Sequence, residues 1–196
     1  MGSLVLTGAT SGSITVAPPD VAGTNTATIG AATGTHYPFT AGTAAASTSG
    51  TSIDFTGIPS WVKRITVMFN GVSTNGTSEV LIQIGTSGGI QTTSYSGAGT
   101  VATSAVSTTA YSTGFMNYTN AEGATSVRHG SVILSLLDSG SGIWTCQGNL
   151  ASSAAARSYM LSGSKTLSGT LDRVRITTVN GTDTFDAGSV NILYEG

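Results

Sequence analysis

Short runs in which apolar and polar residues alternate dominate this chain after residue 51. Between residues 61 and 69, Ile65, Val67 and Phe69 fall on one face of an extended segment, and the intervening residues fall on the other. No window has the spacing of an amphipathic helix, and a parallel sheet needs crossover helices. The pattern therefore predicts an all-β domain with antiparallel strands. Comparable runs lie at 80–84, 110–118, 127–137, 143–148, 157–161, 171–179 and 190–194.

Asparagine–glycine pairs separate several of these runs, and both residues tolerate the positive φ that tight turns require. Asn70-Gly71 and Asn75-Gly76 predict a hairpin that returns through the run at 80–84. Asn180-Gly181 predicts a second hairpin between the last two strands. About eight to ten short strands joined in this way are typical of an antiparallel β-sandwich, and we expect one of the jelly-roll type.

The first 53 residues carry a single charged side chain, Asp20, and few large apolar ones. Such a segment buries too little apolar surface to offset the conformational entropy that it loses on ordering. Short strands are predicted at Ser13–Val16 and Thr26–Ile29, and pairs of this size are marginal in water. We therefore expect residues 1–36 to form an extended docking arm whose strands pair with a neighbouring copy or a host surface. The residues expected to make the docking contacts are Ile14, Val16, Pro18, Pro19 and Ile29.

The remainder of the chain divides by composition into a linker and a domain. Residues 37–50 are small and polar, as in a flexible linker. Residues 51–196 hold every Lys and Arg and both Trp, and they are numerous enough for one hydrophobic core. The predicted organisation is an arm at 1–36, a linker at 37–50 and a β-sandwich at 51–196.

Composition excludes several classes of partner and location. A formal net charge of −2 and a pI near 5.5 provide no basic surface for a phosphate backbone, so no nucleic-acid partner is expected. The single cysteine, Cys146, excludes an intramolecular disulfide and an all-thiolate zinc site. No run approaches the roughly 18 apolar residues of a membrane span, and residues 1–7 lack the features of a signal peptide. We expect synthesis in the cytoplasm, without export by that route and without membrane insertion.

Acidic residues near turns are the first candidates for a chemical role. Asp183 and Asp186 could supply calcium ligands or a carboxylate pair for glycoside cleavage, but three-residue spacing in a loop fixes no distance between them. We interpret both as turn residues, and Asp138, which precedes Ser139–Gly142, as a third. No metal site is predicted.

His129 is the second candidate for chemistry. It follows Glu122 by seven residues and could act as a general base oriented by that carboxylate. No Gly-x-Ser-x-Gly elbow is predicted, because such an elbow needs a strand-to-helix turn and no helical pattern occurs in the chain, and no other nucleophile is placed. Gly163–Thr166 lacks the glycine before the lysine that a phosphate-binding loop requires. We therefore expect a non-enzymatic protein with no catalytic residues and no cofactor, in which His129 has a strand-entry or interface role.

Aromatic side chains are the remaining means of binding a ligand, because ring faces stack on the apolar faces of sugars. Trp61 and Trp144 lie in predicted strands and are expected to be buried. Tyr95 and Tyr118 lie near predicted loops. They are the candidate glycan contacts.

Three segments resemble known proteins. Gly12–Pro19 together with Ala22–Thr26 resembles segments repeated in tail-fibre and virion proteins of tailed bacteriophages. Ile53–Ile65 and Asp183–Ile192 resemble the compact β domain that often ends such fibres. The resemblance implies a homotrimer that resists disassembly, located at the virion surface and engaged in host attachment. Such fibres usually have a long shaft before the terminal domain, whereas here the arm begins at Met1.

Three functions compete at this stage. The first is a non-enzymatic structural protein of a phage virion surface, which is either a tail-fibre receptor-binding tip or a capsid decoration protein. Its expected partners are further copies of itself, other virion proteins and a host surface glycan. The second is a glycan depolymerase, which needs two carboxyl groups in one cleft. The third is a soluble lectin-like module that belongs to no particle.

Overall fold

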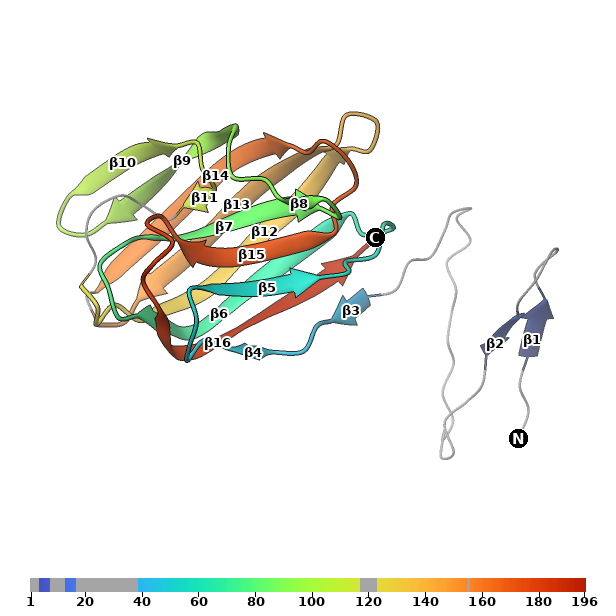
Figure 1. Cartoon of the computed structure of the whole chain (residues 1–196), viewed down its shortest axis with the longest axis horizontal. Coiled ribbons are helices and arrows are strands. Elements are labelled where there is room, and N and C mark those ends of the chain that lie inside the picture. Colours follow the sequence, from blue (N-terminus) through green and yellow to red (C-terminus); the bar gives the residue numbers. More distant parts are fainter. Residues whose placement is uncertain (1–3, 8–12, 17–38, 117–122, 155) are drawn as a thin grey trace. The chain divides into compact units, whose positions relative to one another are not determined.

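The computed structural model describes residues 4–7, 13–16, 39–116, 123–154 and 156–196. The chain divides into two compact units, Met1–Thr35 and His36–Gly196 (Figure 1). Every regular element among the described residues is a β-strand, and every strand pairing is antiparallel. The all-β prediction is thus confirmed.

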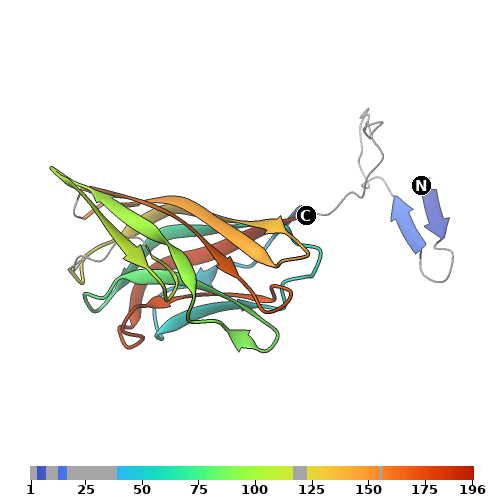
Figure 2. The same ribbon diagram turned by 90° about the horizontal axis from the view of Figure 1, so that it is seen from above.

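The second unit consists of two sheets stacked as layers (Figure 2). The large sheet is nine-stranded and the small sheet is five-stranded. In spatial order the large sheet contains β10 (Val106–Tyr111), β9 (Tyr95–Ala102), β14 (Arg157–Thr166), β13 (Ile143–Ser152), β12 (Arg128–Asp138), β6 (Arg64–Thr74), β16 (Phe185–Glu195) and β3 (Phe39–Ala41), and β4 (Ala45–Ala46) also pairs with β16. The small sheet contains β11 (Phe115–Met116), β7 (Val80–Thr86), β15 (Arg173–Thr178) and β5 (Ser52–Thr56), and β8 (Gly89–Ile90) pairs with β7. This is the predicted antiparallel sandwich, and its jelly-roll subtype stays a prediction.

The core lies between the two sheets, where the inward-facing residues of the alternating runs meet. On β6, Ile65 and Val67 have no exposed surface and Phe69 is 5% exposed, as the alternation predicted. Their counterparts on the small sheet include Val174 and Ile176, which are also fully buried. Each large apolar side chain buried in this way contributes about 1.5–3 kcal/mol relative to an exposed one. Removal of this apolar surface from water holds the two layers together.

Both predicted hairpins are wrong, because each chain reversal carries the backbone from one sheet to the other. β6 belongs to the large sheet and β7 to the small sheet, so Asn75-Gly76 lies in a crossing between layers. The same is true of Asn180-Gly181, which connects β15 to β16. Turn residues encode a reversal of direction, but which strands then pair depends on which apolar faces the sandwich must cover.

Asn70-Gly71 does not form a turn at all but lies inside β6 at a β-bulge. The register of β6 shifts here against both neighbours, β12 and β16. Gly71, Gly130 and Gly188 lie at these irregularities on three adjacent strands, and their φ values are +68°, +129° and +89°. Glycine adopts these left-handed or extended conformations without a Cβ penalty. The bulges therefore form a line across the centre of the large sheet.

Gly188→Ala is expected to destabilise the sandwich by about 3 kcal/mol or more. An added Cβ would lie 2.3 Å from the backbone oxygen of Gly71, in addition to the strain of a positive φ. The matched control is Gly181→Ala, since Gly181 also has a positive φ of +68° but an added Cβ meets nothing within 4 Å. That control should lose only about 1–2 kcal/mol. Urea unfolding measures both, and equal losses would contradict the proposed close approach of β6 and β16.

The segment predicted as a linker differs from the expectation wherever it is described, at residues 39–50. β3 and β4 both pair with β16 and extend the large sheet. Ser47 is fully buried, and its hydroxyl donates to the backbone oxygen of Ala187 at 2.7 Å. This segment forms strands because β16 would otherwise have an unpaired edge. Its small side chains allow the backbone to lie close against that edge.

The first unit contains one described hairpin. β1 (Leu4–Thr7) pairs with β2 (Ser13–Val16), and the pairs run from Leu4 with Val16 to Thr7 with Ser13. The strand predicted at residues 13–16 is confirmed, and within the chain its partner is β1. Val5 and Leu6 are 53% and 54% exposed. Among the residues expected to dock, Ile14 and Val16 belong to β2, whereas Pro18, Pro19 and Ile29 lie outside the described residues, as does the strand predicted at 26–29.

Candidate functional site

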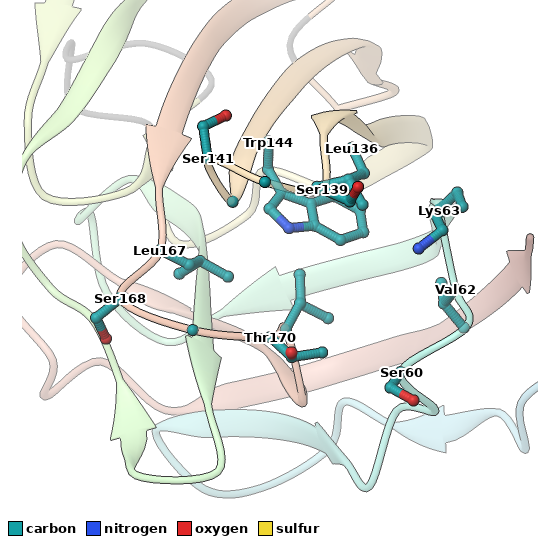
Figure 3. Close-up of a pocket in the computed structure, with 14 residues that line it drawn as sticks. Ser60, Val62, Lys63, Leu136, Ser139, Ser141, Trp144, Leu167, Ser168 and Thr170 are labelled. Atoms are coloured by element: carbon teal, nitrogen blue, oxygen red, sulfur yellow. The ribbon is translucent and has the colours of Figure 1, made fainter.

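A pocket of about 290 Å³ lies at one end of the sandwich, between the two sheets. Three connections of the chain form it: the segment that leads from β5 into β6, the turn between β12 and β13, and the segment between β14 and β15. Figure 3 shows these segments around the indole of Trp144. We call this cavity the end pocket.

Backbone hydrogen bonds fix the segments that surround the end pocket. The Lys63 amide donates to Glu195 O at 2.8 Å, and the Lys63 carbonyl accepts from the Leu136 amide at 2.8 Å. The Leu167 amide donates to Gly142 O at 3.0 Å, which ties the second connection to the third. The end pocket is therefore lined by backbone that the sandwich holds in place.

Asp138 organises the turn between β12 and β13. Its carboxylate accepts hydrogen bonds from the amides of Gly140 and Ser141 at 3.2 and 2.9 Å. Hydrogen bonds from the Ser141 side chain and from these backbone amides hold the pKa of Asp138 below its usual range. This arrangement is an Asx turn, so the structural interpretation of Asp138 is confirmed.

The lining of the end pocket combines an apolar floor, a hydroxyl rim and one cation. Trp144 is 3% exposed and Leu136 is half-buried, and together they form the floor. Ser139 and Thr170 are exposed at the rim, and among the described residues Lys63 is the only charged one that lines the cavity. No Asp, Glu or His of the described residues lines it. The end pocket therefore offers binding groups but no carboxylate pair for general acid–base chemistry.

A second cation, Lys165, lies inside the sandwich near this end. Its side chain is 6% exposed, and its ammonium lies 5.4 Å from the centroid of the Tyr95 ring. Lys165 is directly opposite Trp144 on the neighbouring strand. Burial lowers the pKa of the ammonium, because desolvation disfavours its charged form. The aromatic ring offsets part of that cost.

Lys165→Met is expected to raise the free energy of unfolding most at neutral pH. The wild-type lysine has a lower pKa when folded, so the unfolded chain binds more protons and wild-type stability rises with pH towards the unfolded pKa near 10.4. The advantage of the methionine variant should therefore shrink as the pH rises from the lowered pKa of Lys165 towards the unfolded value. Urea unfolding of both proteins tests this. Tyrosine and cysteine ionisation affects both chains alike, so a difference that stays constant with pH would contradict the prediction.

Tyr95, the first candidate glycan contact, is not available to a ligand. It is 4% exposed, its hydroxyl accepts from the Ile84 amide at 2.8 Å, and the same hydroxyl donates to Gln91 O at 2.8 Å. Its ring packs edge-on against Phe115 at 4.9 Å. Burial raises the pKa of the hydroxyl. At this point of β7 no neighbouring strand among the described residues accepts a hydrogen bond from the Ile84 amide. The Tyr95 hydroxyl is its acceptor instead.

Tyr95→Phe is expected to cost about 2 kcal/mol of unfolding free energy, because it leaves the buried Ile84 amide without its acceptor. Tyr111→Phe is the matched control. The Tyr111 hydroxyl donates a single bond, to Ser162 O at 2.8 Å, so its loss should cost only about 1 kcal/mol. Thermal and urea unfolding compare the two variants. A larger loss for Tyr111→Phe would overturn the assigned role of Tyr95.

The other aromatic candidates have mixed outcomes. Tyr118 lies outside the described residues. Trp144 is buried, as predicted, whereas Trp61 is only half-buried and packs against Tyr194 with ring centroids 5.9 Å apart. The end pocket therefore takes the place of Tyr95 as the candidate ligand site, whereas Tyr118 stays a prediction.

The acidic residues near the last crossing form turn contacts instead of a shared site. Asp183 accepts from the Ser78 amide at 2.8 Å and from the Asn180 side-chain amide at 2.6 Å. These bonds, that from Asn180 first, hold the pKa of Asp183 below its usual range. Asp186 pairs with the Ser73 hydroxyl. No cluster of three potential metal-ligating side chains occurs among the described residues.

His129 is held by the line of bulges. Its Nδ1 accepts from the Gly71 amide at 3.2 Å, and its Nε2 lies 3.5 Å from the Ser153 hydroxyl. Glu122, the orienting group considered for a general base, lies outside the described residues. The contacts that the structure gives His129 are those of a residue that satisfies a bulged amide, which agrees with a structural role.

A second hollow, of about 630 Å³, lies on the outer face of the large sheet. It crosses β10, β9, β14, β13 and β12, and its lining is rich in hydroxyls and amides with no charged side chain. The residues paired across these strands in one row are Thr108, Thr100, Met160, Asn149 and Ser131. This face is broad and uncharged, and it differs in both respects from the end pocket.

No sequence pattern groups Lys63, Ser139 and Thr170. The only signal was that each lies near a predicted turn, and their three segments are far apart in the chain. Only the stacking of the sheets brings these segments to the same end.

No helix in the described part of the chain is long and apolar enough to cross a membrane. Comparison of the chain with protein-family models, curated proteins and solved structures finds no match.

Proposed function

We propose that this chain is a non-enzymatic structural protein of a bacteriophage virion surface, which docks through its N-terminal arm and presents its β-sandwich as a receptor-binding tip. The observation that carries the proposal is the division of the chain into two compact units, with a separate hairpin at the arm. The resemblance of Gly12–Pro19 and Ala22–Thr26 to segments of tail-fibre proteins supports the phage context.

The hairpin supports a docking role through its exposed apolar residues. Val5 and Leu6 are adjacent in β1, so their side chains project to opposite faces of the hairpin. Both are more than half exposed. A hairpin with apolar groups on both faces gains the most binding free energy when a partner covers both faces, and its strand edges can pair with the partner's strands at the same time. The partner that we propose is another virion protein, with further copies of this chain in a homotrimer.

The sandwich supports the role of an exposed tip. Charged residues are only 8% of the chain, against about 25% in typical domains, so hydroxyl and amide groups supply most of the contact with water. The end pocket adds a hollow in which a host molecule can bind. In contrast, a depolymerase needs paired carboxyl groups, and no Asp or Glu among the described residues lines this pocket.

Deletion of residues 1–36 is expected to leave a folded sandwich that no longer joins the particle. Wild-type and truncated chains would be produced, with a tag, in cells that assemble the virus encoding this protein. Particles would be purified on a density gradient, and mass spectrometry would count the tagged copies. Circular dichroism would confirm that the truncated protein keeps its β structure and cooperative unfolding.

A finer variant separates docking from a general effect of truncation. Val5→Ser with Leu6→Ser should reduce incorporation at least tenfold. The control pair, Val106→Ser with Leu137→Ser, removes two apolar groups of the sandwich that are even more exposed and should leave incorporation unchanged. Normal incorporation of the truncated chain would overturn the proposal. A few trimers at the tail would identify a receptor-binding tip, whereas hundreds of copies per particle would overturn that assignment in favour of capsid decoration.

A further inference from the structure

We propose that the end pocket binds a saccharide that carries a carboxylate, such as a hexuronic acid, with Lys63 as the partner of that carboxylate and Trp144 as the floor beneath the sugar ring. This inference deepens the proposed function, since it names the class of host molecule that the exposed sandwich would recognise. The binding itself is a property of the isolated chain and needs no particle.

The size of the end pocket suits one sugar ring. Its volume of about 290 Å³ lies at the lower limit of ligand pockets, which are typically about 300–1,000 Å³. The pocket opens at the loop end of the sandwich, so a longer glycan can extend from it into solvent. The shape therefore favours recognition of a single residue, at a terminus or a branch.

The floor of the pocket offers both an apolar surface and a hydrogen-bond donor. Trp144 is 3% exposed, so it closes the bottom of the cavity and its ring face offers a sugar little stacking surface. No described residue accepts a hydrogen bond from its indole N–H, and this atom is not among the fully buried polar atoms that lack a partner. In Figure 3 the indole nitrogen is directed towards Leu167 and the cavity. The donor is therefore available to a ligand hydroxyl.

The rim supplies the groups that match the hydroxyls of a sugar. Ser139 and Thr170 are exposed and come from different connections of the chain. Ser168, beside Thr170, already accepts from the Gln91 side chain at 2.6 Å and is thereby oriented. Hydroxyl groups donate and accept, so a rim of this kind suits a ligand with several neighbouring hydroxyls.

Charge decides between classes of saccharide. In the part of the chain that the structure describes, Lys63 is the only charged residue that lines the pocket, and Figure 3 shows its ammonium turned towards the indole of Trp144. No carboxylate of the described residues forms an ion pair with Lys63. The nearby Asp138 directs its oxygens to the amides of its own turn. A carboxylate in the pocket therefore gains a charge-assisted hydrogen bond that a neutral sugar does not.

The position of Lys63 is set before any ligand binds. Its amide and its carbonyl are both hydrogen-bonded, to Glu195 and Leu136. Only the side chain must be ordered on binding, which limits the entropic cost of recognition.

The inference can be tested with three monosaccharides that share one ring but differ in charge. Sodium glucuronate, glucose and glucosamine would be titrated at pH 6 into the full-length chain labelled with ¹⁵N. The Trp144 indole signal would be followed by NMR, and Trp61→Phe would distinguish the two tryptophan signals. We expect glucuronate to shift this signal with an affinity about tenfold higher than glucose, and glucosamine to bind most weakly.

Three variants assign the effect to the pocket. Lys63→Gln should lower glucuronate affinity about tenfold and leave glucose affinity unchanged. The neighbouring Arg64→Gln, which removes the same charge outside the pocket, should leave both unchanged. Thr170→Phe places a ring at the exposed rim and should abolish binding of both sugars. Unfolding curves would confirm that each variant remains folded.

Any one of three results would overturn the inference. The first is equal affinity for the three sugars, and the second is an indole signal that does not shift at any concentration. The third is an equal loss of glucuronate affinity in Lys63→Gln and Arg64→Gln. Each of these results is distinguishable from failure of the proposed function. Particle incorporation depends on the arm, so a chain that enters virions normally but ignores glucuronate would refute only the saccharide site. A chain that binds glucuronate but never enters a virion would refute only the virion role.

Discussion

Burial of the apolar inner faces of two antiparallel sheets is the interaction on which the rest of this structure depends. The chain has few charged residues and a single cysteine, so surface ion pairs and disulfides can add little to its stability. The inward rows, such as Ile65 and Val67 on β6 and Val174 and Ile176 on β15, are fully buried and continuous across the sandwich. The end pocket lies where this packing brings together three connections of the chain and the ends of β12 and β13.

The line of glycine bulges is the second constraint. Gly71, Gly130 and Gly188 interrupt three neighbouring strands at the same level, and His129 satisfies one of the bulged amides. Bulges increase local twist and bend a strand. Here they let the central strands of a nine-stranded sheet depart from a flat surface while their inner residues remain against the smaller sheet.

The end pocket follows from this architecture. Its three segments are connections between strands, and each is tied to the framework by backbone hydrogen bonds such as that from Leu167 to Gly142. The pocket thus has a rigid base and a rim of exposed, substitutable residues. Protein scaffolds commonly place binding groups in this way, because loops can vary without cost to the core. The arm hairpin exposes Val5 and Leu6, and these are the residues to which the proposed function assigns docking.

By itself, the sequence determined the fold class, the inward rows and the small strand at residues 13–16, because alternation and turn chemistry are local properties of neighbouring residues. It also indicated that Asp138 belongs to a turn. The tertiary structure decided the rest. Pairings between distant strands decide whether Asn180-Gly181 leads to a hairpin or to a crossing between layers. They also decide whether Tyr95 faces a ligand or the core. The grouping of Lys63, Trp144 and Thr170 in one pocket has the same origin, since residues far apart in the chain meet only when two sheets stack.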